Sequence, residues 1–191
     1  MQTTERKAAR EWKATVDDLY AVPENGKAEL VDGRLVRMSP TGDRPGRAGM
    51  KIVLRLYEYE KQAREGRVYP DNVGFLVDLP DRKSFSPDAA FYVGPRAGGK
   101  FLQGSPVFAV EVRSEGDYGA RAERAMTRKR ADYFTAGTLV VWDVDVLRDE
   151  VVRVYRASEP ERPVVYGRGE AAEAEPALPG WRMPVDEIME V

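Results

Sequence analysis

Residues 107–113 read Val107-Phe108-Ala109-Val110-Glu111-Val112-Arg113, an apolar run that closes on a carboxylate and a guanidinium. A short continuous apolar run is typical of a strand buried on both faces of a sheet. A second run, Ser86-Pro87-Asp88-Ala89-Ala90-Phe91-Tyr92-Val93, opens on a carboxylate instead. The two runs predict buried strands at 88–93 and 107–112, with one acid near an end of each.

Two long helices are predicted on either side of these strands. Apolar residues recur at helical spacing over 47–64 and again over 118–135. Gly66 is expected to end the first helix, and Gly137 takes the C′ position of the second. Asp117 is expected to be the N-cap of the second helix.

The remaining elements complete the predicted topology. Asp32-Gly33 separates two apolar runs, which is a strong signal for a type I′ hairpin over 28–38. Further strands are predicted at 73–79, at 139–144 and, on the sheet edge, at 150–155. The order helix, strand, strand, strand, helix, strand behind an N-terminal hairpin predicts an α/β fold with a mixed sheet.

Composition limits the chemistry. The chain has 191 residues, of which 32% are charged, and it has neither cysteine nor histidine. Disulfides, thiolate sites and imidazole catalysis are therefore excluded, and any metal must be held by oxygen. We expect a flexible segment at 1–14 and a single domain at 15–191. No window approaches the ~18 apolar residues of a membrane helix, and no signal peptide is visible, so we expect no membrane partner and a cytoplasmic location.

Asp88 and Glu111 carry the functional prediction. If their strands are neighbours, the two carboxylates can hold magnesium or manganese, and the carbonyl of Val112 can add another oxygen. Such an ion can offset phosphate charge, activate water and stabilise the leaving oxygen in phosphodiester cleavage. The pattern therefore predicts hydrolysis of phosphodiester bonds.

Two cations are predicted to serve this site. Arg113 follows Glu111 by two residues, so strand alternation places both on one face. Because it stays charged at any working pH, Arg113 suits charge stabilisation. Lys129 lies within an apolar stripe of the second helix, so it is expected to point inward and to need an anionic partner. Beside Asp88 and Glu111, it could position water or stabilise the transition state.

A purely structural interpretation of the same residues stays open. Asp88 could cap its strand, and Glu111 could pair with Arg113. A basic stripe also runs along the first long helix, at spacings of three and four, and consists of Arg44, Arg47, Lys51 and Arg55. Such a stripe could contact DNA phosphates without reading sequence, or it could be a solvated helix face.

Several segments, in this order, resemble the Uma-two type family of restriction-endonuclease-like proteins in the PD-(D/E)XK nuclease superfamily. They are Ala28-Glu29-Leu30-Val31-Asp32-Gly33-Arg34-Leu35 with Met38-Ser39-Pro40, then Pro87-Asp88-Ala89-Ala90-Phe91, Val110-Glu111-Val112-Arg113-Ser114, Lys129-Arg130-Ala131-Asp132-Tyr133-Phe134-Thr135-Ala136-Gly137 and Val141-Trp142-Asp143-Val144. The resemblance spans about 15–189. Each segment alone is weak, but their order and spacing together are specific.

The resemblance implies a restriction-endonuclease-like core, magnesium dependence and DNA cleavage. Asp88 takes the first acid position and Glu111 the second. Arg113 stands where the superfamily name expects lysine, and Lys129 matches the helix lysine that replaces it in this family. Glu29 matches an acid of the family's hairpin, which either completes the site or orients the hairpin.

Relatives often carry a histidine near Gly46, which this chain lacks. Two hypotheses therefore follow: a metal-dependent DNA endonuclease acting on duplex DNA, or an inactive nucleic-acid-binding module that keeps the nuclease fold. A relative acting on RNA or nucleotides cannot be separated from these by sequence. A homodimer is plausible, joined through the strand at 150–155 or the front hairpin.

Overall fold

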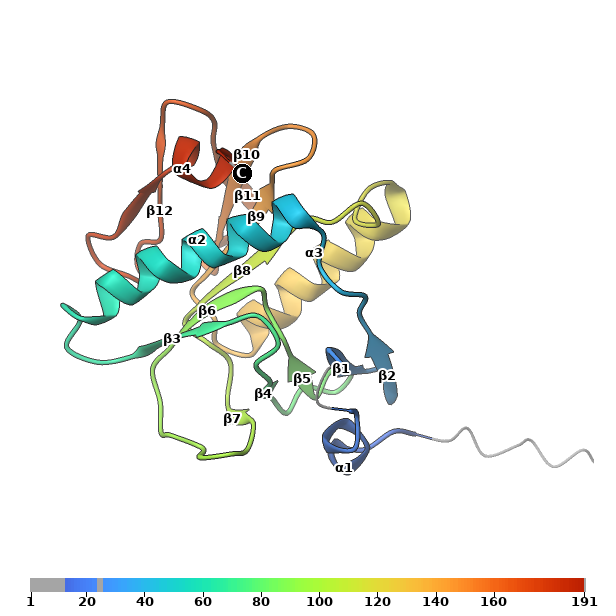
Figure 1. The fold of residues 1–191 in the computed structure, drawn as a ribbon. Coiled ribbons are helices and arrows are strands. Elements are labelled where there is room, and N and C mark those ends of the chain that lie inside the picture. Colours follow the sequence, from blue (N-terminus) through green and yellow to red (C-terminus); the bar gives the residue numbers. More distant parts are fainter. Residues whose placement is uncertain (1–12, 24–25, 191) are drawn as a thin grey trace, which may run out of the picture.

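Six strands form a mixed central sheet in the computed structural model, which describes residues 13–23 and 26–190. The strand order is β11-β10-β9-β8-β6-β3 (Figure 1), and β8 and β9 run parallel while the other neighbours are antiparallel. Their bounds are β3 Arg67–Pro70, β6 Ala89–Tyr92, β8 Phe108–Val112, β9 Val140–Asp145, β10 Val151–Arg156 and β11 Glu159–Tyr166.

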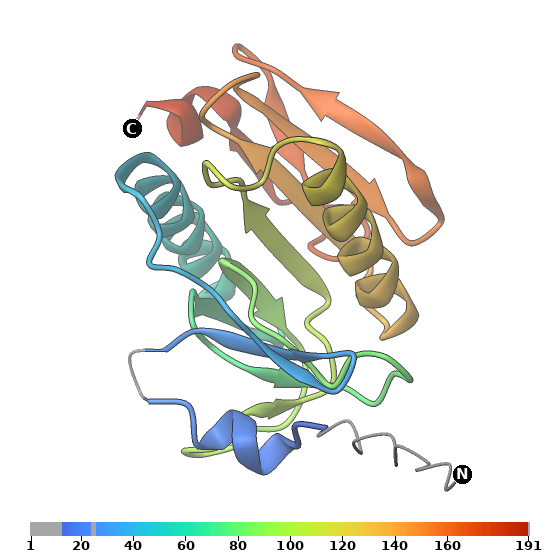
Figure 2. The ribbon, with the colours of Figure 1, turned by 90° about the vertical axis from the view of Figure 1, so that its right-hand side faces the viewer.

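Two long helices cover opposite faces of this sheet, as Figure 2 shows: α2 (Asp43–Glu60) and α3 (Ala120–Thr135). Side chains alternate along a strand, so Val110 packs with Ile52 and Leu56 of α2, whereas Ala109 packs with Tyr133 of α3. The odd-numbered residues of β8 therefore face α3. This alternation directs Glu111 and Arg113 to the same side of the sheet.

The C-terminal segment closes the α2 side of the core. It contains β12 (Ala171–Glu173), β13 (Arg182–Pro184) and α4 (Val185–Met189). The Trp181 ring lies 5.1 Å from the Trp142 ring, and the indole N–H of Trp142 donates to the carbonyl of Glu173 at 2.9 Å. The tail is therefore part of the fold, held by two buried tryptophans.

The front hairpin is fixed against the α3 side. It consists of β1 (Ala28–Val31) and β2 (Arg34–Arg37), and both turn residues, Asp32 and Gly33, have positive φ, as a type I′ turn requires. Arg128 of α3 donates to both carboxylate oxygens of Asp32, at 2.7 and 2.8 Å. Smaller elements surround the hairpin: α1 (Val16–Tyr20), β4 (Phe75–Leu76), β5 (Ser84–Phe85) and β7 (Leu102–Gln103), the last three forming a small separate sheet.

The α/β class, the mixed sheet and the N-terminal hairpin are confirmed. Gly137 also ends α3 as predicted: it has φ +104°, and the N–H of Thr138 donates to the carbonyl of Tyr133 in a Schellman motif. The first long helix, in contrast, ends at Glu60 rather than at Gly66, which instead lies at φ +97° just before β3.

Two strand predictions are wrong. The first strand of the central sheet is β3 at 67–70, and the predicted strand at 73–79 contributes only the two residues of β4 to the small sheet. The strand predicted as an edge, β10, is paired on both sides, and β11 forms the edge. β11 contains Pro160 and Pro163, and no strand was predicted there; an edge strand tolerates proline because one side of it makes no ladder hydrogen bonds.

Among the described helices, none has the length and apolar character needed to cross a membrane. The segment predicted to be flexible, 1–14, lies outside the described residues apart from Lys13 and Ala14. Ala14 is buried, and its N–H donates to the carbonyl of Gly33 at 2.7 Å.

Candidate active site

Asp88 and Glu111 lie opposite one another on neighbouring strands. Ala89 pairs with Val110 in the β6–β8 register, so the next position along brings Asp88 opposite Glu111. The N–H of Val112 donates to one carboxylate oxygen of Asp88 at 2.7 Å. This contact fixes the Asp88 side chain at the point where β6 begins, beside the Glu111 side chain.

Glu111 is held from the α3 side by two donors. The ammonium of Lys129 lies 2.8 Å from its carboxylate, and the hydroxyl of Tyr133 donates to Oε1 at 2.7 Å. Burial raises the pKa of Glu111 to about 6, since the charge of Lys129, which lowers it, does not compensate for desolvation and for the neighbouring charge of Asp88. The sequence alone gives Tyr133 no role, because nothing in an apolar stripe reveals where a hydroxyl points.

Lys129 also connects Glu111 to the front hairpin. Its ammonium lies 2.9 Å from a carboxylate oxygen of Glu29, and its side chain is only 14% exposed. Burial by itself would lower the pKa of Lys129, but the two carboxylates outweigh it and hold that pKa above its ordinary value. For Glu29, burial opposes ionisation, but Lys129 and Arg82 together keep its pKa below the ordinary value. The buried lysine therefore stays charged between two ionisable acids.

A second lysine, Lys27, lies on the other side of the carboxylates. Its ammonium is 2.8 Å from Asp88 and 2.6 Å from Asp71, and its side chain is 13% exposed. Burial would lower its pKa, but the charges of Asp88 and Glu111 raise it above the ordinary value. Sequence reasoning missed Lys27, because a single lysine just before a strand belongs to no periodic pattern.

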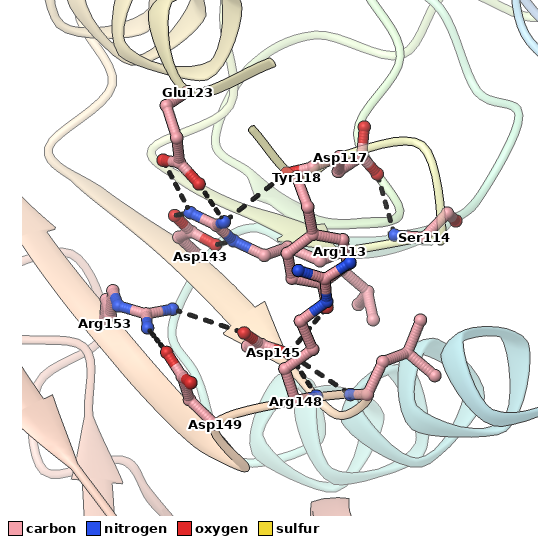
Figure 3. Close-up of polar contacts among 12 residues, drawn as sticks. Arg113, Ser114, Asp117, Tyr118, Glu123, Asp143, Asp145, Arg148, Asp149 and Arg153 are labelled. Carbon is pink, nitrogen blue, oxygen red and sulfur yellow. Dashed lines mark hydrogen bonds and ion pairs between the residues drawn. The ribbon is translucent and has the colours of Figure 1, made fainter. Parts of the chain in front are cut away.

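Arg113 shares the face of Glu111 but has other partners (Figure 3). Its guanidinium donates from Nε and Nη2 to the two carboxylate oxygens of Asp143, at 2.7 and 2.8 Å, and also bonds Glu123 of α3. The hydrogen bonds that Arg113 donates to Asp143 are the largest cause that raises the pKa of Arg113. The structure thus does not show the pairing of Arg113 with Glu111 that the structural interpretation assumed. It also does not bring the guanidinium to Asp88.

The basic stripe of α2 lies on the opposite side of the sheet from Glu111. Arg44 pairs with Glu150 at 3.0 Å, and Arg55 pairs with Glu187 at 3.3 Å. Lys51 donates to the carbonyl of Glu187 at 2.9 Å, and Arg47 is exposed. Most of the stripe is therefore engaged with the C-terminal segment and the β9–β10 turn.

Oxygen atoms that suit a divalent ion converge where Asp88 meets Glu111. Within 13–23 and 26–190, no three acidic side chains are arranged as a ready metal cage. Two carboxylates nevertheless match the ligand set of magnesium, which retains several waters. The ammonium of Lys27 already shows that a cation fits against Asp88. A surface pocket of about 600 Å³ lies elsewhere, between the segments 76–79 and 103–104, and neither acid lines it.

Comparison with known proteins identifies the family and the fold of the chain. The model of the Uma2 family, described as "Putative restriction endonuclease", matches residues 15–186. No match was found among curated proteins. The chain is similar in structure to a protein from Anabaena variabilis ATCC 29413 described as a putative nuclease belonging to DUF820. The TM-score is 0.72 at 16% identity, and the match covers 92% of this chain and 97% of the other. At that identity, the likeness establishes a shared fold.

Proposed function

The chain belongs to the Uma2 family, and we propose that its Asp88–Glu111 site cleaves DNA as a metal-dependent endonuclease. One observation carries the proposal: an inward lysine amine lies 2.8 Å from one of two carboxylates that face each other across neighbouring strands. Burying a lysine ammonium and its acidic partners costs desolvation free energy, which the ion pairs must offset. An arrangement of this kind is typical of functional sites. Phosphodiester hydrolysis uses this combination of acids and a fixed cation.

Asp88 and Glu111, with the carbonyl of Val112, are the groups that would hold magnesium or manganese. When bound, the ion supplies positive charge that offsets the phosphate and polarises the scissile bond. The protein's own part is to hold both carboxylates in a fixed orientation. The N–H of Val112 orients Asp88, and the hydroxyl of Tyr133 orients Glu111.

The two lysines have different parts in this proposal. Lys129, held by Glu111 and Glu29, directs its ammonium at the site and would stabilise the charge that develops on the phosphate oxygens. Lys27 neutralises Asp88 when no divalent ion is bound, and on ion binding its ammonium is free to contact phosphate. We assign Glu29 to positioning Lys129. Arg113, already neutralised by two acids, serves to hold α3 on the sheet.

A plasmid assay tests the proposal. Supercoiled DNA incubated with the protein and magnesium or manganese is expected to be nicked or linearised, and chelation should stop the reaction. Asp88→Ala and Glu111→Ala should each abolish cleavage with circular dichroism unchanged. Asp78→Ala is the matched control, because the side chain of Asp78 is 97% exposed and lies away from the site. Equal cleavage by all variants would refute the assignment.

A second function is favoured by one specific observation: each of the paired acids is already neutralised by a lysine. A site closed in this way suits an inactive module that binds nucleic acid and keeps the nuclease fold. Calorimetric titration with manganese separates the two functions. Site-specific binding that Asp88→Ala removes supports the endonuclease, and its absence supports the inactive module.

The substrate we propose is duplex DNA, and cutting both strands would require two copies of the site. The strand at 150–155, expected to form a dimer interface, is β10, and it is paired on both sides. We therefore propose the free edge strand, β11, as the dimer interface. Val164 and Val165 of β11 expose 43% and 50% of their surface. Sedimentation analysis of a Val164→Lys variant tests this interface.

A further inference from the structure

A polar pocket lies beside the candidate active site, where β8 and β9 end and α3 begins (Figure 3). It has a volume of about 440 Å³ and is lined by Tyr118, Gly119, Arg148 and Arg153, among others. Arg113 also lines it. Arg113 directly follows β8 and lies two residues after Glu111 on the same side of the sheet, so the Cα atoms of the two residues are about 7 Å apart and the pocket begins beside the candidate site.

The carboxylates around this pocket already accept hydrogen bonds. Asp145 accepts from the Tyr118 hydroxyl at 2.7 Å and from the N–H of Arg148 at 3.0 Å. Glu123 accepts from two nitrogens of the Arg113 guanidinium, and Asp149 accepts from Arg153. The acids are thus engaged in holding the walls of the pocket together.

Three arginines and three carboxylates line the pocket, and two of the arginines keep N–H groups that make no hydrogen bond to the described residues. Nη1 of Arg153 is buried and makes no hydrogen bond in the part of the chain that the structure describes. Its nearest recorded carboxylate oxygen, on Asp145, lies 3.9 Å away, which is an ion-pair distance but too long for a hydrogen bond. The guanidinium of Arg148 lies 3.7 Å from the centre of the Tyr118 ring, and stacking leaves its in-plane N–H groups available.

The start of α3 lies beside the same pocket, which Gly119 and Glu123 line. Its N-cap is Gly119 at φ +93°, and Gly119 supplies no side-chain cap. Asp117, the predicted N-cap, instead accepts from the N–H of Ser114 at 2.7 Å. The first hydrogen bond within the helix runs from Glu123 to Gly119. The N–H groups of 120–122 therefore lie in the turn where a helix has no internal acceptor and carries a partial positive charge.

We propose that this pocket binds a phosphate group. Two arginine forks and a helix start supply donors from separate directions, which suits a ligand with several acceptor oxygens and negative charge. The inference deepens the proposed function, because a phosphate held here would anchor a nucleic acid strand next to the scissile position. Two sources share this chemistry: a backbone phosphodiester of bound nucleic acid and free inorganic phosphate.

Titration with inorganic phosphate, followed by nuclear magnetic resonance, tests the site without metal and without cleavage. We expect saturable shifts at the amides of 119–122 and at the Arg148 and Arg153 side chains. Arg148→Ala should weaken binding at least tenfold, whereas Arg182→Ala, which removes an exposed arginine of β13, should not. Arg153→Lys tests the second donor with the charge kept. The proposal is overturned if phosphate gives no saturable shift, or if chloride gives the same one.

Duplex binding then identifies the source of the phosphate. In an Asp88→Asn background, which suppresses cleavage, fluorescence anisotropy is measured over a range of salt. If the pocket holds a backbone phosphate, Arg148→Ala should reduce the slope of log K against log salt by about 1 relative to Arg182→Ala. An unchanged slope alongside lost phosphate binding assigns the pocket to free phosphate. If the protein binds phosphate saturably but cuts no DNA, the proposed nuclease function is refuted and the proposed phosphate site is retained.

Discussion

Replacing Lys129 by methionine tests the buried ion pairs that Lys129 forms with Glu29 and Glu111. The substitution keeps the apolar stem of the side chain but leaves two buried carboxylates, Glu29 and Glu111, without the ammonium that lies 2.8–2.9 Å from each. Breaking a buried ion pair by removing one partner costs about 3–5 kcal/mol. For a chain of this size each kcal/mol lowers Tm by about 2–4 °C, so Tm should fall by about 6–20 °C.

The assay is urea unfolding followed by circular dichroism, with Lys129→Met, Glu29→Gln and the double variant forming a cycle. Glu29 keeps its ion pair with Arg82, but removing its charge still eliminates one of the two acids that lost the ammonium, so the double variant should recover about 1–3 kcal/mol relative to the sum of the single effects. Lys61→Met is the control. Lys61 lies at the C-terminal end of α2 and its side chain is exposed, so this change should alter stability little. A loss below about 1 kcal/mol for Lys129→Met, or strict additivity, would refute the buried three-membered arrangement.

Three further outcomes follow from the same contacts. Lys27→Met should raise manganese affinity about fivefold in calorimetry, because the competing ion pair with Asp88, worth about 1 kcal/mol, no longer has to be broken; lower affinity would mean that Lys27 helps to hold the ion. Glu29 has a folded pKa below its ordinary 4.5, so it stabilises the fold above that pH and this contribution is lost as pH falls. Urea unfolding from about pH 6 to pH 3 should therefore show wild type and Glu29→Gln converging in acid, and a constant gap would contradict this. Arg113→Met should cost about 3 kcal/mol, since it removes the closest ion-pair partner of the fully buried Asp143 and leaves only Arg130, at 3.5 Å, yet it should leave manganese affinity unchanged; a large loss of affinity would place Arg113 in the site after all.

Local patterns in the sequence were enough to predict the central elements. Asp88 and Glu111 stand at strand ends that register brings opposite each other, and the helical spacing of Lys129 directs it inward. Glu29 could be connected with them only through the family resemblance, because nothing within the hairpin shows which way it docks. Asp88, Glu111 and Lys129 were predictable from the sequence because strand alternation and helical periodicity determine which face of an element a side chain occupies.

The remaining features depend on contacts between distant segments, which periodicity does not encode. Lys27 reaches Asp88 across 61 positions of the chain. Arg113 lies on the predicted face, but its guanidinium forms an ion pair with Asp143. Asp143 is the neighbour of Glu111 in the parallel β8–β9 pair. The edge strand β11 was missed for a similar reason: its prolines oppose strand propensity, and only the neighbouring β10 makes the conformation favourable.

The most direct test of the central claim is a crystal grown with manganese, measured for anomalous scattering. We expect one peak bounded by the carboxylates of Asp88 and Glu111, with the Lys27 ammonium moved away from Asp88. A peak elsewhere, or an empty site with Lys27 still paired to Asp88 at saturating manganese, would contradict a metal-dependent nuclease.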